Sequence, residues 1–307
     1  MNDLAEETWS KISTGGPRGL NFGEDSLTDH NLWILDRQHP GLNVHHYNQS
    51  EERYSGADWE WWIGSDARGW ICLRIQAKRI YKKSYPQLDH PGEGDSDYQY
   101  DTLIDSCDLS HGQYPLHVFY NGWAKDHFGD QTGWAKPANW LACPRSAQPG
   151  DCIHADVEHY GCAVSSSFSV KRIHDKRDGN RRLVTQHISW SVPWSYLFGN
   201  EPLASEYARR YEKFELYHDG GEYDDEIEAT RHWLDWVQRS LDLMTLRAFE
   251  GDSPDWANAL RRIPFSQRRF ARLPGYANVV RLGIAEDSIR DVTLANARMV
   301  IVLDSDA

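Results

Sequence analysis

The chain has 307 residues, of which 40% are hydrophobic and 26% are charged, and its formal net charge is −13. This composition excludes a disordered or collagen-like chain, and the length allows one large domain or a core with an appended lobe. No apolar stretch approaches the roughly 20 residues that cross a bilayer, and MNDLAEETWSKI lacks the apolar centre of a signal peptide, so we expect a cytoplasmic protein without a membrane partner.

The first half of the chain alternates between helical and strand periodicity. A first helix is predicted over residues 24–38, with Leu27, Asn31, Ile34 and Leu35 inward. Further elements, in order, are a strand over 42–49, strands over 57–64 and 70–80 that form a hairpin around SDARG, a helix over 98–107 with Leu103, Ile104 and Cys107 inward, and a buried strand over 115–121.

The second half is expected to be mainly helical. Residues 121–151 are predicted to be irregular and residues 161–173 to form a strand. Apolar residues recur at helical spacing in two later segments, first Tyr207, Tyr211 and Phe214, then Ile227, Leu234, Val237, Leu241 and Met244. We therefore predict an α/β fold, a mixed sheet flanked by helices over residues 1–195, and a mainly helical region over 196–307. The boundary is soft, and one continuous domain is also compatible.

The hairpin can be worked out in register. If Ser65 to Gly69 form the loop, Gly64 faces Trp70, and Asp58 faces Gln76 at the other end. Strand alternation places Asp58, Gln76 and Lys78 on one face, and Ile71, Leu73, Ile75 and Ala77 on the core face. Oxygen-bearing side chains beside a lysine suit Mg²⁺-dependent hydrolysis of a phosphodiester, because Mg²⁺ prefers oxygen ligands and Lys stabilises developing negative charge.

The blocks GADWEWW and LRIQAKR resemble the D…(E/Q)xK signature of the PD-(D/E)xK nucleases, the restriction-endonuclease-like superfamily, and are closest to its Mrr-type branch. The resemblance implies a restriction-endonuclease-like sheet in which Asp58, Gln76 and Lys78 are catalytic. Many members take another acid from the first helix, and Glu24 matches that position. The likeness covers roughly residues 21–121. The whole chain also resembles an uncharacterised bacterial family with ADWEWWI and QAKR blocks, which does not give the substrate.

The activity that this resemblance implies is that of a metal-dependent endonuclease. Asp58, Gln76 and Glu24 would bind Mg²⁺ or Mn²⁺, and the substrate would be nucleic acid, with DNA favoured over RNA. A restriction or phage-defence role and a homo-oligomer are further expectations. Gln76 departs from the acidic pattern, and a neutral amide holds a divalent ion less well than a carboxylate. An inactive nucleic-acid-binding module on the same fold therefore stays open.

Each candidate residue also has a plain structural explanation. Glu24 could complement the dipole at a helix N-terminus, and Lys78 could be a surface lysine that contributes charge and no packing. Glu60 is expected to form an exposed cross-strand pair with Arg74. Glu51 and Glu52 could replace Glu24, and Gln99 could reach the site from the next helix.

Three runs are basic although the chain as a whole is acidic: residues 78–83, 171–182 and 261–272. A solvated face explains each run, but Arg79, Lys82 and Lys83 are candidates for contact with nucleic acid because they follow Lys78. The odd cysteine count argues against a disulfide framework. Cys143, Cys152, His154, His159 and Cys162 lack zinc-site spacing and are expected to be buried thiols and surface histidines.

A third interpretation is a carbohydrate-binding or carbohydrate-active protein. The 14 tryptophans favour this interpretation, in which Asp58 and Glu60 would be the acid pair. The pair is poorly arranged for this chemistry because Arg74 is expected opposite Glu60 and would hold its carboxylate ionised.

Overall fold

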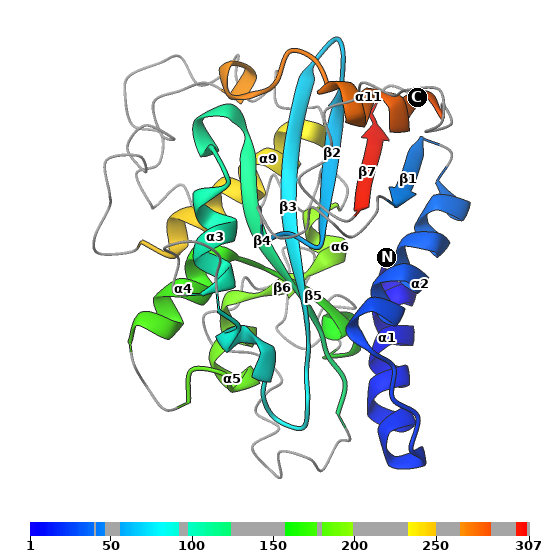
Figure 1. Cartoon of the computed structure of the whole chain (residues 1–307), viewed down its shortest axis with the longest axis vertical. Helices are drawn as coiled ribbons and strands as arrows, with labels where there is room; N and C mark the ends of the chain where they lie inside the picture. Colours follow the sequence, from blue (N-terminus) through cyan, green and yellow to red (C-terminus); the bar gives the residue numbers. More distant parts are fainter. Residues whose placement is uncertain are drawn as a thin grey trace, which may run out of the picture.

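The computed structural model describes residues 1–39, 41–46, 56–91, 98–123, 157–176, 180–198, 233–249, 265–283 and 299–305. Seven strands from these residues form one mixed sheet, and helices flank it (Figure 1). The predicted α/β class with a mixed sheet flanked by helices is therefore confirmed. No helix in the described ranges is both long enough and apolar enough to cross a membrane.

The strand order is β1-β7-β2-β3-β4-β5-β6. The strands are β1 (Leu42–His46), β2 (Trp59–Ser65), β3 (Gly69–Arg79), β4 (Gln113–Tyr120), β5 (Cys162–Ser166), β6 (Val192–Pro193) and β7 (Met299–Asp304). The helices are α1 (Asn2–Gly15), α2 (Glu24–Gln38), α3 (Gln99–Asp105), α4 (Ser167–Asp175), α5 (Val184–His187), α6 (Trp194–Leu197), α9 (Trp233–Arg247) and α11 (Gly275–Leu282).

Most predicted elements of the first half are confirmed. α2 has the predicted bounds, and Leu27, Asn31 and Leu35 are buried on its inner side, as expected. Strands β1 to β4 and helix α3 lie within a few residues of their predicted ranges. In α3, Leu103 is fully buried and Ile104 is half-buried, and Cys107, which lies two residues past the end of the helix, is also half-buried. The strong local periodicity of these segments explains the agreement.

Two helices were not anticipated. α1 precedes the helix that was expected to be first, and its buried residues Leu4, Thr8 and Ile12 recur at helical spacing. The strand predicted over residues 161–173 is wrong beyond Ser166, where α4 begins. Val170 and Ile173 are buried three residues apart, a spacing that a helix places on one side and a strand on opposite sides.

The C-terminal half contributes an interior strand of the sheet. β7 lies between β1 and β2, antiparallel to β1 and parallel to β2, so the sheet draws on the region expected to be mainly helical. α9 confirms the predicted stripe of Leu234, Val237, Leu241 and Met244. Residues 121–151 are described only as far as Trp123, and Ile227 and the predicted helix with Tyr207, Tyr211 and Phe214 lie outside the described residues.

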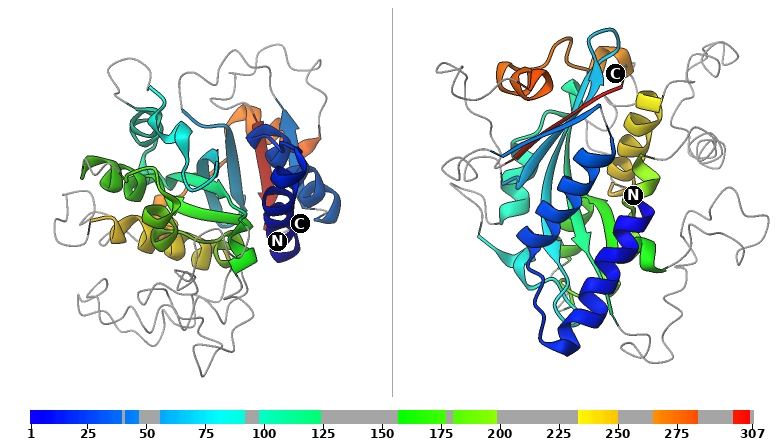
Figure 2. Two further views of the ribbon diagram at one scale, coloured as in Figure 1. Left: turned by 90° about the horizontal axis from the view of Figure 1, so that it is seen from below. Right: turned by 90° about the vertical axis from the view of Figure 1, so that its right-hand side faces the viewer.

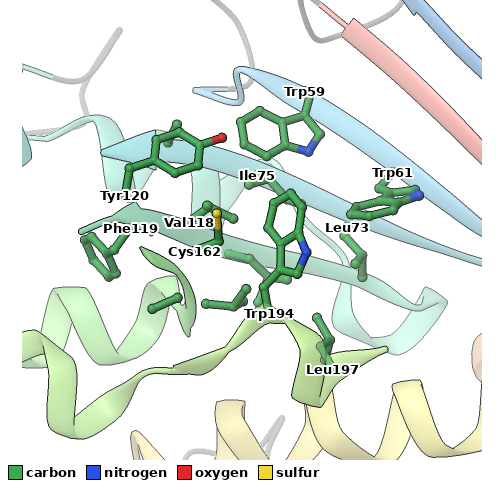
Figure 3. Packing of buried hydrophobic residues seen from close by; sticks show 14 of the residues in the cluster. Trp59, Trp61, Leu73, Ile75, Val118, Phe119, Tyr120, Cys162, Trp194 and Leu197 are labelled. Atoms are coloured by element: carbon green, nitrogen blue, oxygen red, sulfur yellow. The ribbon is translucent and has the colours of Figure 1, made fainter. Parts of the chain in front are cut away.

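A large hydrophobic core packs against one face of the sheet. Figure 3 shows Trp59 and Trp61 of β2 beside Leu73 and Ile75 of β3, with Trp194 of α6 packed over them. The rings of Trp61 and Trp194 meet edge-on, with centroids 6.0 Å apart. Several tryptophans therefore contribute to the hydrophobic core, where burial of their large side chains is favourable.

The opposite face carries polar side chains, yet it is covered as well. Helices lie against both faces, and α9 (yellow) covers one of them (Figure 2). On the other face, the Tyr276 hydroxyl of α11 donates to Glu60 at 2.7 Å, and Ser167 of α4 contacts His117 of β4. Both faces of the sheet are therefore covered.

Candidate functional site

The hairpin has the predicted register. Gly64 pairs with Trp70, Trp62 with Cys72, and Glu60 with Arg74. The paired residues run from Ser65 and Gly69 at the loop to Trp59 and Ile75, so Asp58 lies one residue outside the ladder. The Asp58 N–H still donates to the Ile75 carbonyl at 2.8 Å. Asp58 thus lies where β2 begins, beside the last third of β3.

Two carboxylates occupy the edge of β3 that β2 leaves uncovered. Asp58 Oδ2 accepts the Ala77 N–H at 2.6 Å, and Glu24 Oε2 accepts the Arg79 N–H at 2.9 Å. N–H groups two residues apart point to the same edge of a strand, roughly 7 Å from each other. The first residue of α2 and the residue before β2 are therefore aligned side by side along β3.

Lys78 and Gln76 extend from β3 next to these carboxylates. Lys78 Nζ lies 3.8 Å from Glu24 Oε1, and its side chain is only 6% exposed. A surface lysine that adds no packing is therefore the wrong description of Lys78. Gln76 is buried, and its Nε2 donates to the Gly56 carbonyl at 2.9 Å. This bond fixes the orientation of the amide, and no described residue donates a hydrogen bond to its Oε1.

The electrostatics of Glu24 reflect this crowding. Burial raises the pKa of Glu24 to about 7, Lys78 opposes the rise, and the negative charge of Asp58 adds to it. Glu24 and Asp58 therefore lie close enough to repel each other, in spite of the lysine beside them. A divalent cation would relieve this repulsion.

The donor set fits a hard divalent cation. Glu24, Asp58 and Gln76 offer carboxylate and amide oxygens, the ligand type that Mg²⁺ and Mn²⁺ accept. Only two of the three are acidic, and within the described ranges no group of three or more His, Cys, Asp or Glu side chains is arranged to hold a metal. A metal here would thus rely on Gln76 and on oxygens from water or substrate.

Sequence reasoning missed a buried histidine beside the site. His117 of β4 pairs in register with Gln76, and its Nδ1 lies 2.9 Å from Ser167 Oγ. Burial, and next the charge of Lys78, hold the pKa of His117 well below its usual range. Its Nε2 has no partner in the described part of the chain. The only signal in the sequence is one histidine within the apolar strand PLHVFY.

Glu60 and Arg74 form the predicted cross-strand pair, but the expectation of an exposed pair is wrong. Glu60 Oε1 accepts Arg74 Nε–H at 2.9 Å, and the side chains are 0% and 7% exposed. Glu60 Oε2 also accepts from Tyr276 and, at 3.3 Å, from Trp62. α11 covers the pair, so Glu60 is closed to a glycan and cannot act with Asp58 as an exposed acid pair.

Arg79 and the lysines after β3 lie at the same end of the strand. Arg79 Nη1 donates to Asn21 at 2.7 Å, and burial lowers the pKa of Arg79. Lys82 and Lys83 are exposed on the turn between Tyr81 and Ser84. Further along the chain, Arg268 is not part of a solvated face, because it is buried in an ion pair with Asp242 at 2.5 Å.

The remaining candidates are only partly described. Cys162 is a buried thiol, as expected, whereas His159 is buried against Glu6 and is not a surface histidine. Gln99 opens α3, and its backbone lies beside Gly56. Glu51, Glu52, Cys143, Cys152 and His154 lie outside the described residues.

The chain was compared with curated proteins and with protein families. No curated protein matches the chain. The sequence profile of one family, described as a family of unknown function (DUF6615), matches residues 1–306, which is nearly the whole length. The chain therefore belongs to the DUF6615 family.

Proposed function

We propose that this protein is a divalent-metal-dependent nuclease, with its active site at Glu24, Asp58, Gln76 and Lys78. The observation that carries the proposal is the pair of carboxylates held on alternate N–H groups of β3, beside the buried Lys78. The resemblance of ADWEWW and QAK to the PD-(D/E)xK pattern supports the same residues. A restriction-endonuclease-like sheet, DNA as substrate and a defence role follow from that resemblance and belong to the proposal.

Each side chain has a role that its contacts support. Glu24, Asp58 and Gln76 would hold the cation, which when bound would supply Lewis-acid activation of the phosphate and of a water. The N–H groups of Ala77 and Arg79 orient the two carboxylates along β3. Lys78, almost excluded from solvent, stabilises the negative charge that develops on the phosphate more strongly than an exposed lysine would.

A catalytically silent nucleic-acid-binding module is the second candidate. The neutral Gln76 and the lack of a third acidic or histidine ligand among the described residues favour it. In that case the carboxylates and Lys78 would form a structural cluster, and no metal would promote cleavage.

Cleavage assays separate the two candidates. Plasmid and single-stranded DNA are incubated with the wild-type protein in Mg²⁺, in Mn²⁺ and in EDTA. We expect cleavage only with metal, and a loss of about a hundred-fold to a thousand-fold in rate for Asp58→Asn and for Lys78→Met. Methionine keeps much of the buried stem of Lys78, so it removes the charge with little loss of packing.

Arg37→Gln is the matched control, because Arg37 is exposed at the far end of α2 from Glu24. It should cleave like the wild type. Equal cleavage by wild type and Lys78→Met would exclude this site as the catalytic centre. No cleavage by the wild type with either metal would favour the silent module.

A further inference from the structure

Two basic segments that are far apart in the sequence lie side by side next to the proposed site. The turn after β3 carries Lys82 and Lys83, and the segment before α5 carries Arg181 and Arg182. The Tyr85 N–H donates to the Arg182 carbonyl at 2.9 Å, and the Val184 N–H donates to the Lys83 carbonyl at 3.0 Å. These backbone bonds fix the two segments to each other, and we call Lys82, Lys83, Arg181 and Arg182 the basic edge.

The arginines of the basic edge are positioned by one carboxylate. Asp89 Oδ2 lies 3.4 Å from Arg181 Nη2 and 3.3 Å from Arg182 Nε. The Arg181 guanidinium also lies over the Tyr98 ring, 5.8 Å from its centroid. The two arginine side chains stay 31% and 48% exposed. A single carboxylate cannot offset two guanidiniums, so Asp89 orients them and leaves positive charge at the surface.

The basic edge continues the line of β3 beyond the proposed site. Lys82 follows Lys78 by four residues, and because it lies on the turn between Tyr81 and Ser84, the span is at most the roughly 13 Å of an extended strand. Proteins that bind a single nucleic-acid strand without sequence preference follow its backbone with a positively charged groove. The lower end of the molecule, where β3 leads toward the segment of α5, carries this edge (Figure 1).

We propose that the basic edge binds the phosphodiester backbone of a nucleic-acid strand whose reacting phosphate lies beside Glu24, Asp58 and Lys78. This inference rests on the proposed function and extends it from the reacting phosphate to the flanking ones. The strand crosses from the end of β3 to the Arg181–Arg182 segment. Its binding depends on phosphate charge, so it is independent of base sequence.

Binding is measured by fluorescence anisotropy with labelled single-stranded and duplex DNA of about 20 nucleotides. EDTA is present, so that cleavage does not intervene. The variant Lys82→Gln/Lys83→Gln is compared with Arg37→Gln/Arg272→Gln, which removes two exposed cations at other ends of the fold. Arg181→Gln/Arg182→Gln is a third variant, and its near-UV circular dichroism checks that the Asp89 contacts are not needed for folding.

The salt dependence of the affinity gives the sharpest result. Between about 50 and 200 mM salt, each lost phosphate contact reduces the slope of log K against log salt by about 0.9 for duplex and about 0.7 for single strands. For Lys82→Gln/Lys83→Gln we expect the slope to fall by the amount that two lost phosphate contacts give, and the affinity to be about ten-fold weaker at low salt. The control should keep the wild-type slope and affinity. Wild-type slopes in both edge variants, equal losses in the control, or no binding by the wild type would overturn the proposal.

The outcomes also separate this inference from the proposed function. If the wild type cleaves DNA but the edge variants bind like the wild type, the proposed nuclease activity is retained and the proposed role of the basic edge is wrong. If the basic edge binds nucleic acid but no metal supports cleavage, the proposed nuclease activity is wrong and the basic edge is the binding surface of a silent module.

Discussion

Glu24 lies beside Lys78, and yet the lysine does not keep its carboxylate fully ionised at neutral pH. Burial at the end of α2 outweighs the attraction of a cation 3.8 Å away, and Asp58 adds repulsion, so the pKa of Glu24 is raised to about 7. A buried acid of this kind is a functional-site candidate on physical grounds. It also makes the stability of the metal-free protein depend on pH.

The substitution Glu24→Gln tests this state in EDTA. Because the folded protein binds the proton more tightly than the unfolded chain, the stability from protonated Glu24 is complete below about pH 4.5. It is lost as pH rises toward 7. The glutamine amide carries no charge at either pH, so Glu24→Gln should be about as stable as wild type near pH 5 and on the order of 2–3 kcal/mol more stable at pH 8. Urea unfolding at both pH values measures the difference.

Arg37→Gln again serves as a control, since an exposed cation should shift stability little at either pH. A difference between Glu24→Gln and wild type that does not change with pH would contradict the raised pKa. With Mg²⁺ present, only the wild type should gain stability, because the substitution removes a ligand.

At the scale of elements, α11 is attached to the hairpin through a buried charge pair. Glu60 accepts from Arg74 of β3 and from Tyr276 of α11, and the hydrophobic side chains Trp62 and Val280 pack around these bonds. The pair joins three elements, whereas an exposed pair would join only two strands. Loss of one partner should therefore destabilise both the hairpin and the helix.

We expect Glu60→Ala to cost about 3–5 kcal/mol, because it leaves the Arg74 guanidinium buried without its carboxylate. Asp175→Ala is the matched control: its ion pair with Lys171 is exposed, and its loss should cost about 1 kcal/mol or less. Urea unfolding followed by tryptophan fluorescence gives both values. Equal losses in the two variants would mean that Glu60 and Arg74 are solvated in solution. Glu60→Leu/Arg74→Met should recover part of the loss.

The whole molecule depends on where β7 inserts. Among the described strands, β1 reaches the sheet only through β7, and β2 has β7 as its second neighbour, so the six residues of β7 hold one side of the sheet together. Ile301 faces the large core, whereas Val300 and Val302 face the cluster under α11. The strand is therefore buried on both faces, as parallel strands generally are.

We predict that Ile301→Ala lowers the free energy of unfolding by about 2–5 kcal/mol, as expected for a large core residue cut to alanine. Leu303→Ala, on the same strand but half-buried, should cost clearly less. Chemical denaturation measures both. If the two variants lose the same stability, β7 is not buried between β1 and β2. Truncation before Met299 should leave a chain without a cooperative unfolding transition.

The sequence by itself determined α2, the β2–β3 hairpin with its register, and the neighbourhood of Asp58, Gln76 and Lys78. These features depend on periodicity and on a loop of five residues, which are local properties. Glu24 was placed by helix phase, and the structure brings it to Lys78. The roles of these residues in catalysis stay a prediction.

Tertiary structure alone decided which distant segments meet. It placed β7 between β1 and β2, covered Glu60 and Arg74 with α11, set His117 beside Lys78, and joined the turn after β3 to Arg181 and Arg182. No local pattern specifies such contacts. Several faces of these elements are buried, and local sequence does not determine which of them pack against each other. The raised pKa of Glu24 has the same origin, since it comes mainly from burial that only the packed fold creates.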